Sequence, residues 1–441
     1  MLTLRAASRL CLSAPFALFS FCMLPLAPPA CAQAAAPGAH LELVIVLSRH
    51  GVRSPLTAQA DLDKFSASPW PVWDVAPGIL TAHGYQLMKM FGDWDRTKFA
   101  AEGLLAPSGC ADAAHVTIVA DTDERTRETG KALSEGMFPG CNVSVHSQPG
   151  DATDPLFSPR KANVGNPNPA LAAAAIAGRI GGDPNNLTDT YRPQLAALDR
   201  ILSGCGHLPT NPRRTSIFDV PTSYKPGSGD PPVEARGPVF TAATLAENLL
   251  LEYTQGMSDA DTGWGCVDGA TVRQLMQIDS ARWNFASRTP AVARAYASNL
   301  LDHIRATMEQ RATGKPIPGA LGKPGDRMVI LVGHDTNIVT VSGALGIDWV
   351  LDGRVDDSSP GGAMVFELWR SATTGPFVRV EFTTQTLEQM RKSEPLTAAN
   401  PPAEAPIFVP ACSRPDFSCT WDSFSAAMRQ ATDPAYVSAL P

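Results

Sequence analysis

The sequence has no excess of basic residues. Its 441 residues include 36 Lys and Arg against 43 Asp and Glu, which gives a formal net charge of −7. Nucleic acids and anionic membranes attract proteins that carry a basic face, so neither is expected as a partner. Any anion site in this chain must therefore be a local cluster of cations.

Long apolar segments are also scarce. The run from about residue 11 to 27 is interrupted by Ser, Pro and Cys and has no stop-transfer flank, which argues against a permanent membrane span. Arg5 and Arg9 precede this run, and small residues at 32–34 suit cleavage. We predict that residues 1–34 are a secretory signal and that the mature protein is periplasmic or secreted, without a membrane anchor.

The cysteines lack the close spacing of a metal site. No Cys-x-x-Cys or neighbouring His pair accompanies them, so zinc binding has no support. Cleavage would remove Cys11, Cys22 and Cys31 from a total of 9 and leave an even set. An exported chain meets an oxidising compartment, so disulfides are expected, with the pairing open. The remaining cysteines are Cys110, Cys141, Cys205, Cys266, Cys412 and Cys419.

The composition is that of a globular protein. Hydrophobic residues make up 44% and charged residues 18% of the chain, so disorder is not expected. The length allows one large domain with an insertion, or two domains. We find no internal repeat.

Three apolar runs, distant in the sequence, each end in a charged turn. These are 43–47 before Arg49-His50-Gly51-Val52-Arg53, 116–120 before Asp121-Thr122-Asp123-Glu124-Arg125, and 328–332 before Gly333-His334-Asp335. Such runs are typical of buried strands in a parallel sheet, where ligands bind outside the carboxyl ends of the strands. We therefore expect the three turns to meet in one crevice.

The intervening segments predict the fold class. A helix capped by Thr81 and running to about Gly103, and a second ending near Gly136, alternate with the strands and favour βαβ units. We predict an α/β fold, a mainly parallel central sheet flanked by helices, formed by residues 35–163 and 286–441. Residues 164–285 are predicted to be a smaller, mostly helical inserted domain.

Several finer predictions accompany this fold. Within the insertion we expect helices near 171–178, 192–202 and 241–253 and a long loop over 209–238. Residues 69–77 are expected to form a loop at the mouth of the site. Later strands are predicted at 363–368 and 377–383, and the proline-rich tail after Pro395 is expected to wrap the surface.

The charged turns supply the groups that phosphoryl transfer needs. Arginines can clamp the phosphate oxygens, and His50 can attack phosphorus as a neutral imidazole. Taken singly, Asp335 could be a helix N-cap, His334 a buried histidine, and Arg125 a partner of Glu128 or Asp121. Only their joint occurrence at three strand ends favours catalysis.

The tag Arg-His-Gly-x-Arg-x-Pro at 49–55, with the turns at 121–127 and 333–337, resembles the histidine acid phosphatases, branch 2 of the histidine phosphatase superfamily. Within this family the sequence resembles the bacterial periplasmic acid phosphatases with phytase activity and the glucose-1-phosphatases. Further likenesses span nearly the whole mature chain. They lie at 263–265, 288–290, 360–362 and 385–391.

The resemblance implies a role for each matching residue. His50 would be the nucleophile that becomes a phosphohistidine, and Asp335 would protonate the leaving oxygen and then activate water. The implied phosphate and substrate site consists of Arg49, Arg53, Arg125, His334, Thr57, Asp121 and Glu247. Glu247 could equally be a solvated helix residue. No metal or cofactor is implied, because the arginines neutralise charge. Disulfides Cys110–Cys141 and Cys412–Cys419 are implied too, with Cys205–Cys266 as the remainder.

The substrate is less clearly indicated. In the phytase pattern the tag continues with Pro, Thr and Lys, whereas here Pro55 is followed by Leu56 and Thr57. The missing lysine and the segment 70–75 look more like glucose-1-phosphatases, but His334 to Asn337 and Glu247 look like phytases. We predict a monomeric acid phosphatase for phosphomonoesters, most specifically inositol hexakisphosphate. An acidic optimum would follow if Asp335 must begin protonated.

Other functions stay open at this stage. A glucose-1-phosphatase or a broad sugar-phosphate phosphatase is the near alternative. A mutase-like isomerase and a non-catalytic phosphate-binding protein are less well supported, because the His-Asp pair at 334–335 and the nucleophilic His50 are both present.

Overall fold

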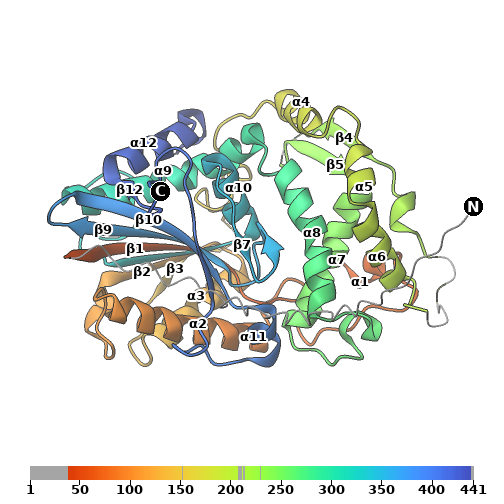
Figure 1. The fold of residues 1–441 in the computed structure, drawn as a ribbon, viewed down its shortest axis with the longest axis horizontal. Helices are drawn as coiled ribbons and strands as arrows, with labels where there is room; N and C mark the ends of the chain where they lie inside the picture. Colours follow the sequence, from red (N-terminus) through yellow and green to blue (C-terminus); the bar gives the residue numbers. More distant parts are fainter. Residues whose placement is uncertain (1–37, 151, 207–210, 212–213, 229, 439–441) are drawn as a thin grey trace, which may run out of the picture. The chain divides into compact units, whose positions relative to one another are not determined.

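A central eight-stranded sheet organises the protein in the computed structural model (Figure 1). The structure describes residues 38–150, 152–206, 211, 214–228 and 230–438, so the predicted signal at 1–34 lies outside the described residues. The strand order is β11-β10-β9-β1-β6-β2-β3, with β12 beside β10. The strands are β1 (Ala39–Arg49), β2 (Val116–Ala120), β3 (Val145–His146), β6 (Met328–Gly333), β9 (Ala363–Ser371), β10 (Gly375–Thr384), β11 (Ala403–Pro406) and β12 (Cys419–Thr420).

The strands that carry the charged turns lie next to one another. β1 and β2 both pair in parallel with β6, while β9 to β12 form the antiparallel part of the sheet. In the register, Arg49 lies opposite Gly333, and Ala120 lies opposite Val332. The three turns therefore leave the sheet at the same edge, as the α/β prediction required.

Strand β1 is apolar on both sides because helices cover both faces of the sheet. Leu43, Ile45 and Leu47 pack into one hydrophobic cluster, and Val44 and Val46 pack into another. Full burial of each such side chain stabilises the fold by about 1.5–3 kcal/mol. The continuous apolar run in the sequence follows from this two-sided burial.

Each face of the sheet has its own helices. α2 (Ala82–Ala101) and α3 (Glu124–Met137) contribute Met88, Phe91, Leu133 and Met137 to the cluster around Val44. α9 (Pro290–Thr313), α10 (Asp335–Leu345) and α12 (Trp421–Ala431) pack on the opposite face, around Ile45. As predicted, Thr81 caps α2 by accepting a hydrogen bond from the Gly84 amide.

Residues 164–285 contribute Leu198, Leu249 and Leu275 to a further hydrophobic cluster, which also includes Leu87 and Leu387 from outside this range. The predicted helices are present here, together with others that the sequence did not indicate. The helices are α4 (Pro169–Arg179), α5 (Asn186–Thr190), α6 (Arg192–Leu202), α7 (Pro238–Thr254) and α8 (Gly269–Phe285). The shorter elements elsewhere are α1 (Gln59–Leu62), α11 (Leu387–Lys392), β7 (Val350–Leu351), β8 (Arg354–Val355) and 3-10 turns at 111–115, 262–265 and 434–436.

Two predictions about irregular segments were wrong. The expected long loop at 209–238 contains a 3-10 turn at 217–219 and a hairpin of β4 (Ser223–Pro226) and β5 (Val233–Arg236). The tail after Pro395 does not simply wrap the surface, because it adds β11, β12 and α12 to the core. Ile407, Phe424 and Met428 are all fully buried. The strands in both segments are only 2 to 4 residues long and lie among prolines. An alternating strand pattern cannot be recognised in so few residues.

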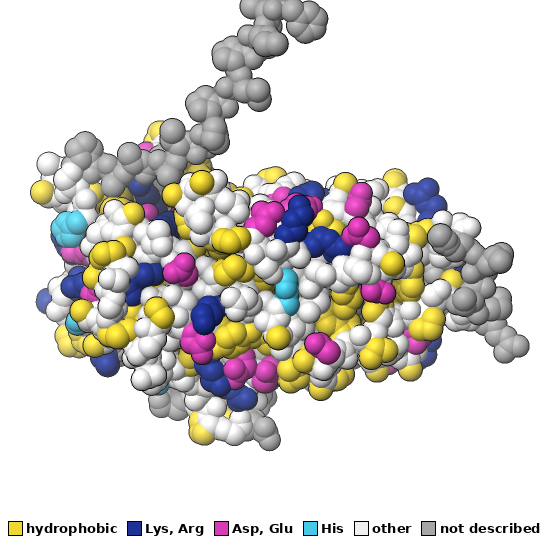
Figure 2. Space-filling model, turned by 90° about the horizontal axis from the view of Figure 1, so that it is seen from below, with side chains coloured by type: hydrophobic (Ala, Val, Ile, Leu, Met, Phe, Trp, Pro, Cys, Tyr) yellow, Lys and Arg dark blue, Asp and Glu magenta, His cyan; other side chains and the backbone are white. Residues whose placement is uncertain are grey.

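Three disulfides connect the described cysteines: Cys110–Cys141, Cys205–Cys266 and Cys412–Cys419. The first and third pairs are those that the resemblance implied, and Cys205–Cys266 is the pair that remained. None of the helices in the described part of the chain has the length and apolarity needed to cross a bilayer. On the face shown in Figure 2, acidic and basic side chains are interspersed rather than gathered by sign.

Candidate active site

The backbone brings two histidines together at the edge of the sheet. The His50 amide donates a hydrogen bond to the Gly333 carbonyl at 3.0 Å, which extends the β1–β6 pairing by one residue. As a result the His50 and His334 ring centroids are 5.6 Å apart. Both rings line a cavity of about 420 Å³, named here the central pocket, whose lining includes Arg53, Arg125 and Asp335.

Two glycines allow this close approach. A Cβ at Gly333 would lie 2.4 Å from Asn337 Oδ1, and a Cβ at Gly51 would lie 2.8 Å from Met88 Cγ. Contacts this short force neighbouring atoms to move in a close-packed interior. The glycines in both sequence motifs are thus explained by packing beside the histidines.

His50 is buried and held as a neutral imidazole. Its Nδ1 lies 2.8 Å from the Gly51 carbonyl oxygen. Because a carbonyl can only accept, Nδ1 carries the hydrogen and Nε2 keeps its lone pair. Burial, followed by the nearby guanidiniums of Arg49 and Arg53, holds the pKa of His50 well below its usual value. This is the state that a nitrogen nucleophile requires.

Asp335 begins helix α10 and faces Arg49, whose Nη2 is 3.0 Å from its carboxylate. Burial by itself would raise the pKa of Asp335, but the guanidiniums of Arg49 and Arg282 outweigh burial and lower it to about 2. Asp335 is therefore ionised before a substrate binds. The simple expectation that it begins protonated does not hold for the ligand-free protein, because the sequence could not show how closely Arg49 approaches.

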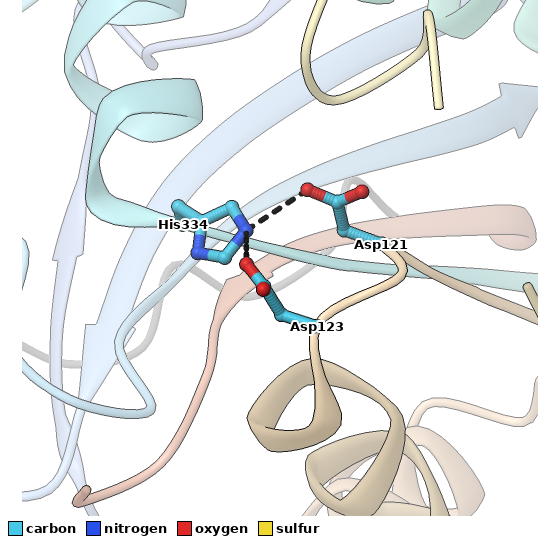
Figure 3. Close-up of side chains that lie close together, drawn as sticks. All are labelled: Asp121, Asp123 and His334. Atoms are coloured by element: carbon cyan, nitrogen blue, oxygen red, sulfur yellow. Dashed lines mark hydrogen bonds and ion pairs between the residues drawn. The ribbon is translucent and has the colours of Figure 1, made fainter. Parts of the chain in front are cut away.

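His334 lies between two carboxylates (Figure 3). Its Nε2 lies 2.9 Å from Asp121 and 3.2 Å from Asp123. Burial lowers the pKa of His334, but the hydrogen bonds to Asp121 and Asp123 more than offset burial and raise it. Asp121 is buried beneath His334 and does not line the central pocket, so it can act on a ligand only through this imidazole.

Glu247 connects the insertion to the arginines of the first turn. From α7, its Oε1 accepts hydrogen bonds from Arg49 Nη2 at 2.5 Å and from Arg53 Nη2 at 3.1 Å. The other terminal nitrogen of Arg49 donates to the Ser358 carbonyl. Glu247 is therefore no solvated helix residue. It fixes the directions of both guanidiniums.

Arg125 and Thr57 have different positions relative to the central pocket. Arg125 lines it and donates to Asp123 at 2.7 Å. Thr57 instead lines a neighbouring cavity of about 200 Å³, together with Trp70 and Trp73. The loop at 69–77, expected at the mouth of the site, also lines this second cavity. Of the two residues that follow Pro55, the apolar Leu56 lines the central pocket and Thr57 does not.

Asp121, Asp123 and His334 also offer atoms close enough together for a metal ion, all within 4.8 Å of one another. The imidazole that would have to ligate is the shared hydrogen-bond donor of both carboxylates, and Asp123 also accepts from Arg125. Because carboxylates only accept, this Nε2 carries a hydrogen and has no lone pair to give a metal. The cluster is thus better described as an ion-pair network.

Several other residues that line the central pocket are not marked by any pattern in the sequence. Arg282 stands over the Trp283 ring at 3.7 Å and bonds Asp279, and its charge helps to lower the pKa of Asp335. These residues come from α8, α9, the loop at 157–161, the turn between β4 and β5, and the link between α8 and α9, where no motif marks them. The additional polar and aromatic residues are Ser158, Arg160, Lys161, Asp230, Arg282, Trp283, Ser287 and Tyr296.

The family profile of the histidine phosphatase superfamily (branch 2) matches residues 40–165 and 242–383, the segments that carry all three charged turns. This chain belongs to the histidine acid phosphatase family. It is accordingly a phosphoric monoester hydrolase.

Two curated relatives match this histidine acid phosphatase over almost its full length. Phytase AppA of Escherichia coli K12 is 33% identical over 428 residues, covering 94% of this chain and 97% of the relative. A glucose-1-phosphatase of Salmonella typhimurium is 26% identical over 414 residues, covering 91% and 94%. The structure of Hafnia alvei phytase in complex with myo-inositol hexakis sulphate is also similar. It has a TM-score of 0.84 and 32% identity, with 92% of this chain and 100% of that chain covered.

Proposed function

We propose that this histidine acid phosphatase hydrolyses phosphomonoesters through a phosphohistidine at His50, with inositol hexakisphosphate as its specialised substrate. The observation that carries the proposal is the neutral His50 ring with a free Nε2 lone pair. It lies in a pocket with Arg53, Arg125 and the Asp335 carboxylate, and the buried Arg49 precedes it in the chain. A solely phosphate-binding protein has no use for a buried, uncharged imidazole among guanidiniums.

The reaction follows from these positions. Arg49, Arg53, Arg125 and His334 bind the non-bridging phosphate oxygens and offset the charge that spreads over them in the transition state. Nε2 attacks phosphorus, the ester P–O bond breaks, and Asp335 gives its proton to the leaving oxygen. Asp335 then takes a proton from water, which attacks the phosphohistidine and releases phosphate and neutral His50.

The proton on Asp335 has to arrive with the substrate. Arg49 keeps the carboxylate ionised in the free protein, but a bound phosphate draws on the same guanidinium and opposes its effect on Asp335. A phosphomonoester has a second pKa near about 6, so at acidic pH it brings a proton into the pocket. An acidic optimum is therefore expected from the substrate's own ionisation.

Glucose 1-phosphate is the second candidate substrate. It is supported by Leu56, an apolar residue at the pocket where the phytase pattern has a polar one, and by the similarity to glucose-1-phosphatases. Comparing kcat/KM for inositol hexakisphosphate and glucose 1-phosphate at about pH 5 decides between the two. A higher value for glucose 1-phosphate would reverse our preference.

Rapid-quench trapping tests the chemistry itself. The wild-type protein should accumulate an acid-labile phosphohistidine, and His50→Ala should form none and lose activity on every ester. Chelation with EDTA should leave turnover of p-nitrophenyl phosphate unchanged, because arginines neutralise the charge in this proposal. Phosphate release by His50→Ala at the wild-type rate would contradict it.

We further propose that the protein is exported after cleavage near residue 34 and acts as a monomer. We also propose that residues 164–285 form an inserted domain within 35–163 and 286–441. The three disulfides support export, since such bonds persist in oxidising compartments. N-terminal sequencing of the exported protein and its sedimentation in solution test the first two points.

A further inference from the structure

Lys161 differs from the other lysine and arginine side chains of the central pocket, because within the described part of the chain it forms neither an ion pair nor a side-chain hydrogen bond. Arg53 is bound to Glu247, Arg125 to Asp123, and Arg282 to Asp279. Arg160 lines the pocket as well, but it is buried and donates to the Val164 and Gly165 carbonyls. Among the described residues, Lys161 is exposed and forms no ion pair.

The segment that carries Lys161 is fixed to the catalytic turn. The Phe157 carbonyl accepts a hydrogen bond from Asn337 Nδ2 at 2.8 Å, and Asn337 Oδ1 accepts from the His334 amide at 2.8 Å. On the other side, Asn299 Nδ2 donates to the Pro155 carbonyl at 2.8 Å. The backbone just before Lys161 is therefore held in a fixed position relative to His334.

The position of Lys161 fits a charge outside the scissile phosphate. It lines the same pocket as His50, and its charge contributes to the lowered pKa of Asp123. The acid on the insertion side, Asp230, is already engaged by the Tyr296 hydroxyl. A second anionic group of the substrate can therefore bind the Lys161 ammonium, which no carboxylate neutralises, next to the arginines of the pocket. The ammonium of a lysine is a compact point charge that binds phosphate without a fixed geometry.

We propose that Lys161 binds a second phosphate group of the substrate and so favours polyphosphorylated esters over monophosphates. This inference rests on the proposed function, since it assumes that the scissile phosphate lies at His50. Leu56 lines the same pocket and carries no charge, so Lys161 would supply a cation that the segment after Pro55 lacks there.

The test separates binding of the second charge from catalysis. p-Nitrophenyl phosphate, with one phosphate, reports the catalytic site. Inositol hexakissulfate, a non-hydrolysable polyanion, is measured as a competitive inhibitor of that reaction. Lys161→Gln should raise the Ki of the polyanion roughly two- to fivefold, the range for one exposed charge pair. The KM and kcat for p-nitrophenyl phosphate should stay within twofold, and Lys161→Arg should restore most of the inhibition.

Lys323→Gln is the matched control, because Lys323 is exposed and lies outside the central pocket. It should leave Ki unchanged. An unchanged Ki in Lys161→Gln, or an equal rise in Ki and in the KM for p-nitrophenyl phosphate, overturns the inference. Absence of His50-dependent hydrolysis in the wild-type protein would instead defeat the proposed function, so the two failures are distinguishable.

Discussion

Glu247 lies between two arginines that the substrate's phosphate also needs. Both guanidiniums are buried. In addition, Arg49 donates a hydrogen bond to the Ser358 carbonyl, and Arg53 donates one to the Ser54 carbonyl. A carboxylate shared by two such cations sets their direction and reduces their mutual repulsion. We infer that Glu247 is a positioning residue for the clamp.

Glu247→Gln should lower kcat/KM for p-nitrophenyl phosphate by roughly 10- to 100-fold, as is common for residues that orient the groups contacting a substrate. The variant keeps the shape of the side chain but loses the charge that draws Arg49 and Arg53 together. The Glu247 and Asp335 carboxylates repel each other, so loss of the Glu247 charge should also lower the pKa of Asp335 and move the acid limb of the pH profile to lower pH. Steady-state kinetics over pH 2–7 measures both effects. A change in thermal stability alone would show a structural role only.

Asp335→Asn should reduce turnover in a way that depends on the leaving group. Loss of a general acid costs roughly 10²- to 10⁴-fold on an alkyl ester such as inositol hexakisphosphate. The loss should be smaller on p-nitrophenyl phosphate, because nitrophenolate leaves without needing a proton. Comparing kcat for the two esters at pH 5 tests this. An equal loss on both would mean that Asp335 matters chiefly through its contact with Arg49.

At the scale of elements, helix α2 contacts the antiparallel strands through a partly buried cluster of carboxylates around Lys98, named here the Lys98 cluster. Lys98 Nζ contacts Glu381 of β10 and lies 3.2 Å from Glu404 of β11. The full cluster is Asp95, Lys98, Glu102, Glu367, Glu381 and Glu404. Burial, and then the neighbouring carboxylates, raise the pKa of Glu367 to about 8. Burial likewise raises the pKa of Asp95 to about 8.

The Lys98 cluster predicts a fold that is more stable in acid than at neutral pH. The folded protein keeps a proton on Glu367 that the unfolded chain, with a pKa near 4.5, releases. This contribution is complete below about pH 4.5 and is lost as the pH rises toward 8. Thermal unfolding followed from pH 4.5 to 8 should show a falling Tm. Glu367→Gln should flatten that slope, whereas Glu234→Gln, at an exposed position, should leave it as it is.

At the scale of the whole molecule, the disulfides close chain segments of very different length. Cys205–Cys266 spans 61 positions within the insertion, Cys110–Cys141 spans 31, and Cys412–Cys419 spans 7. A cross-link restricts the unfolded chain more when it closes a longer loop, typically by about 2–4 kcal/mol. The insertion is therefore expected to depend most on oxidation.

Paired Cys→Ser variants should lose unfolding free energy in the order 205/266, then 110/141, then 412/419. Urea denaturation at fixed pH measures the order, with the 412/419 variant as the internal control for the chemical change itself. If all three lost the same amount, chain restriction would not be the main effect.

The sequence by itself determined the parallel core and the three charged turns. The apolar runs 43–47 and 328–332 are buried on both faces of the sheet. His50 follows the first run and His334 follows the second within three residues, so the pattern that predicts each strand also locates the reactive side chain at its end. Adjacent parallel strands end at one edge. That is enough to bring His50, Arg125 and Asp335 to one pocket without knowledge of any long-range contact.

Only the tertiary structure decided the environment of those residues. Glu247 contacts Arg49 although the two residues are 198 positions apart in the sequence. Phe424, near the C-terminus, packs against the face of the sheet that carries Ile45. Lys161 lines the pocket, whereas Thr57 turns to the second cavity. The pKa of Asp335 depends on guanidiniums from β1 and α8. Contacts between distant segments leave no period or spacing in a single sequence, because each depends on how whole elements pack rather than on neighbours along the chain.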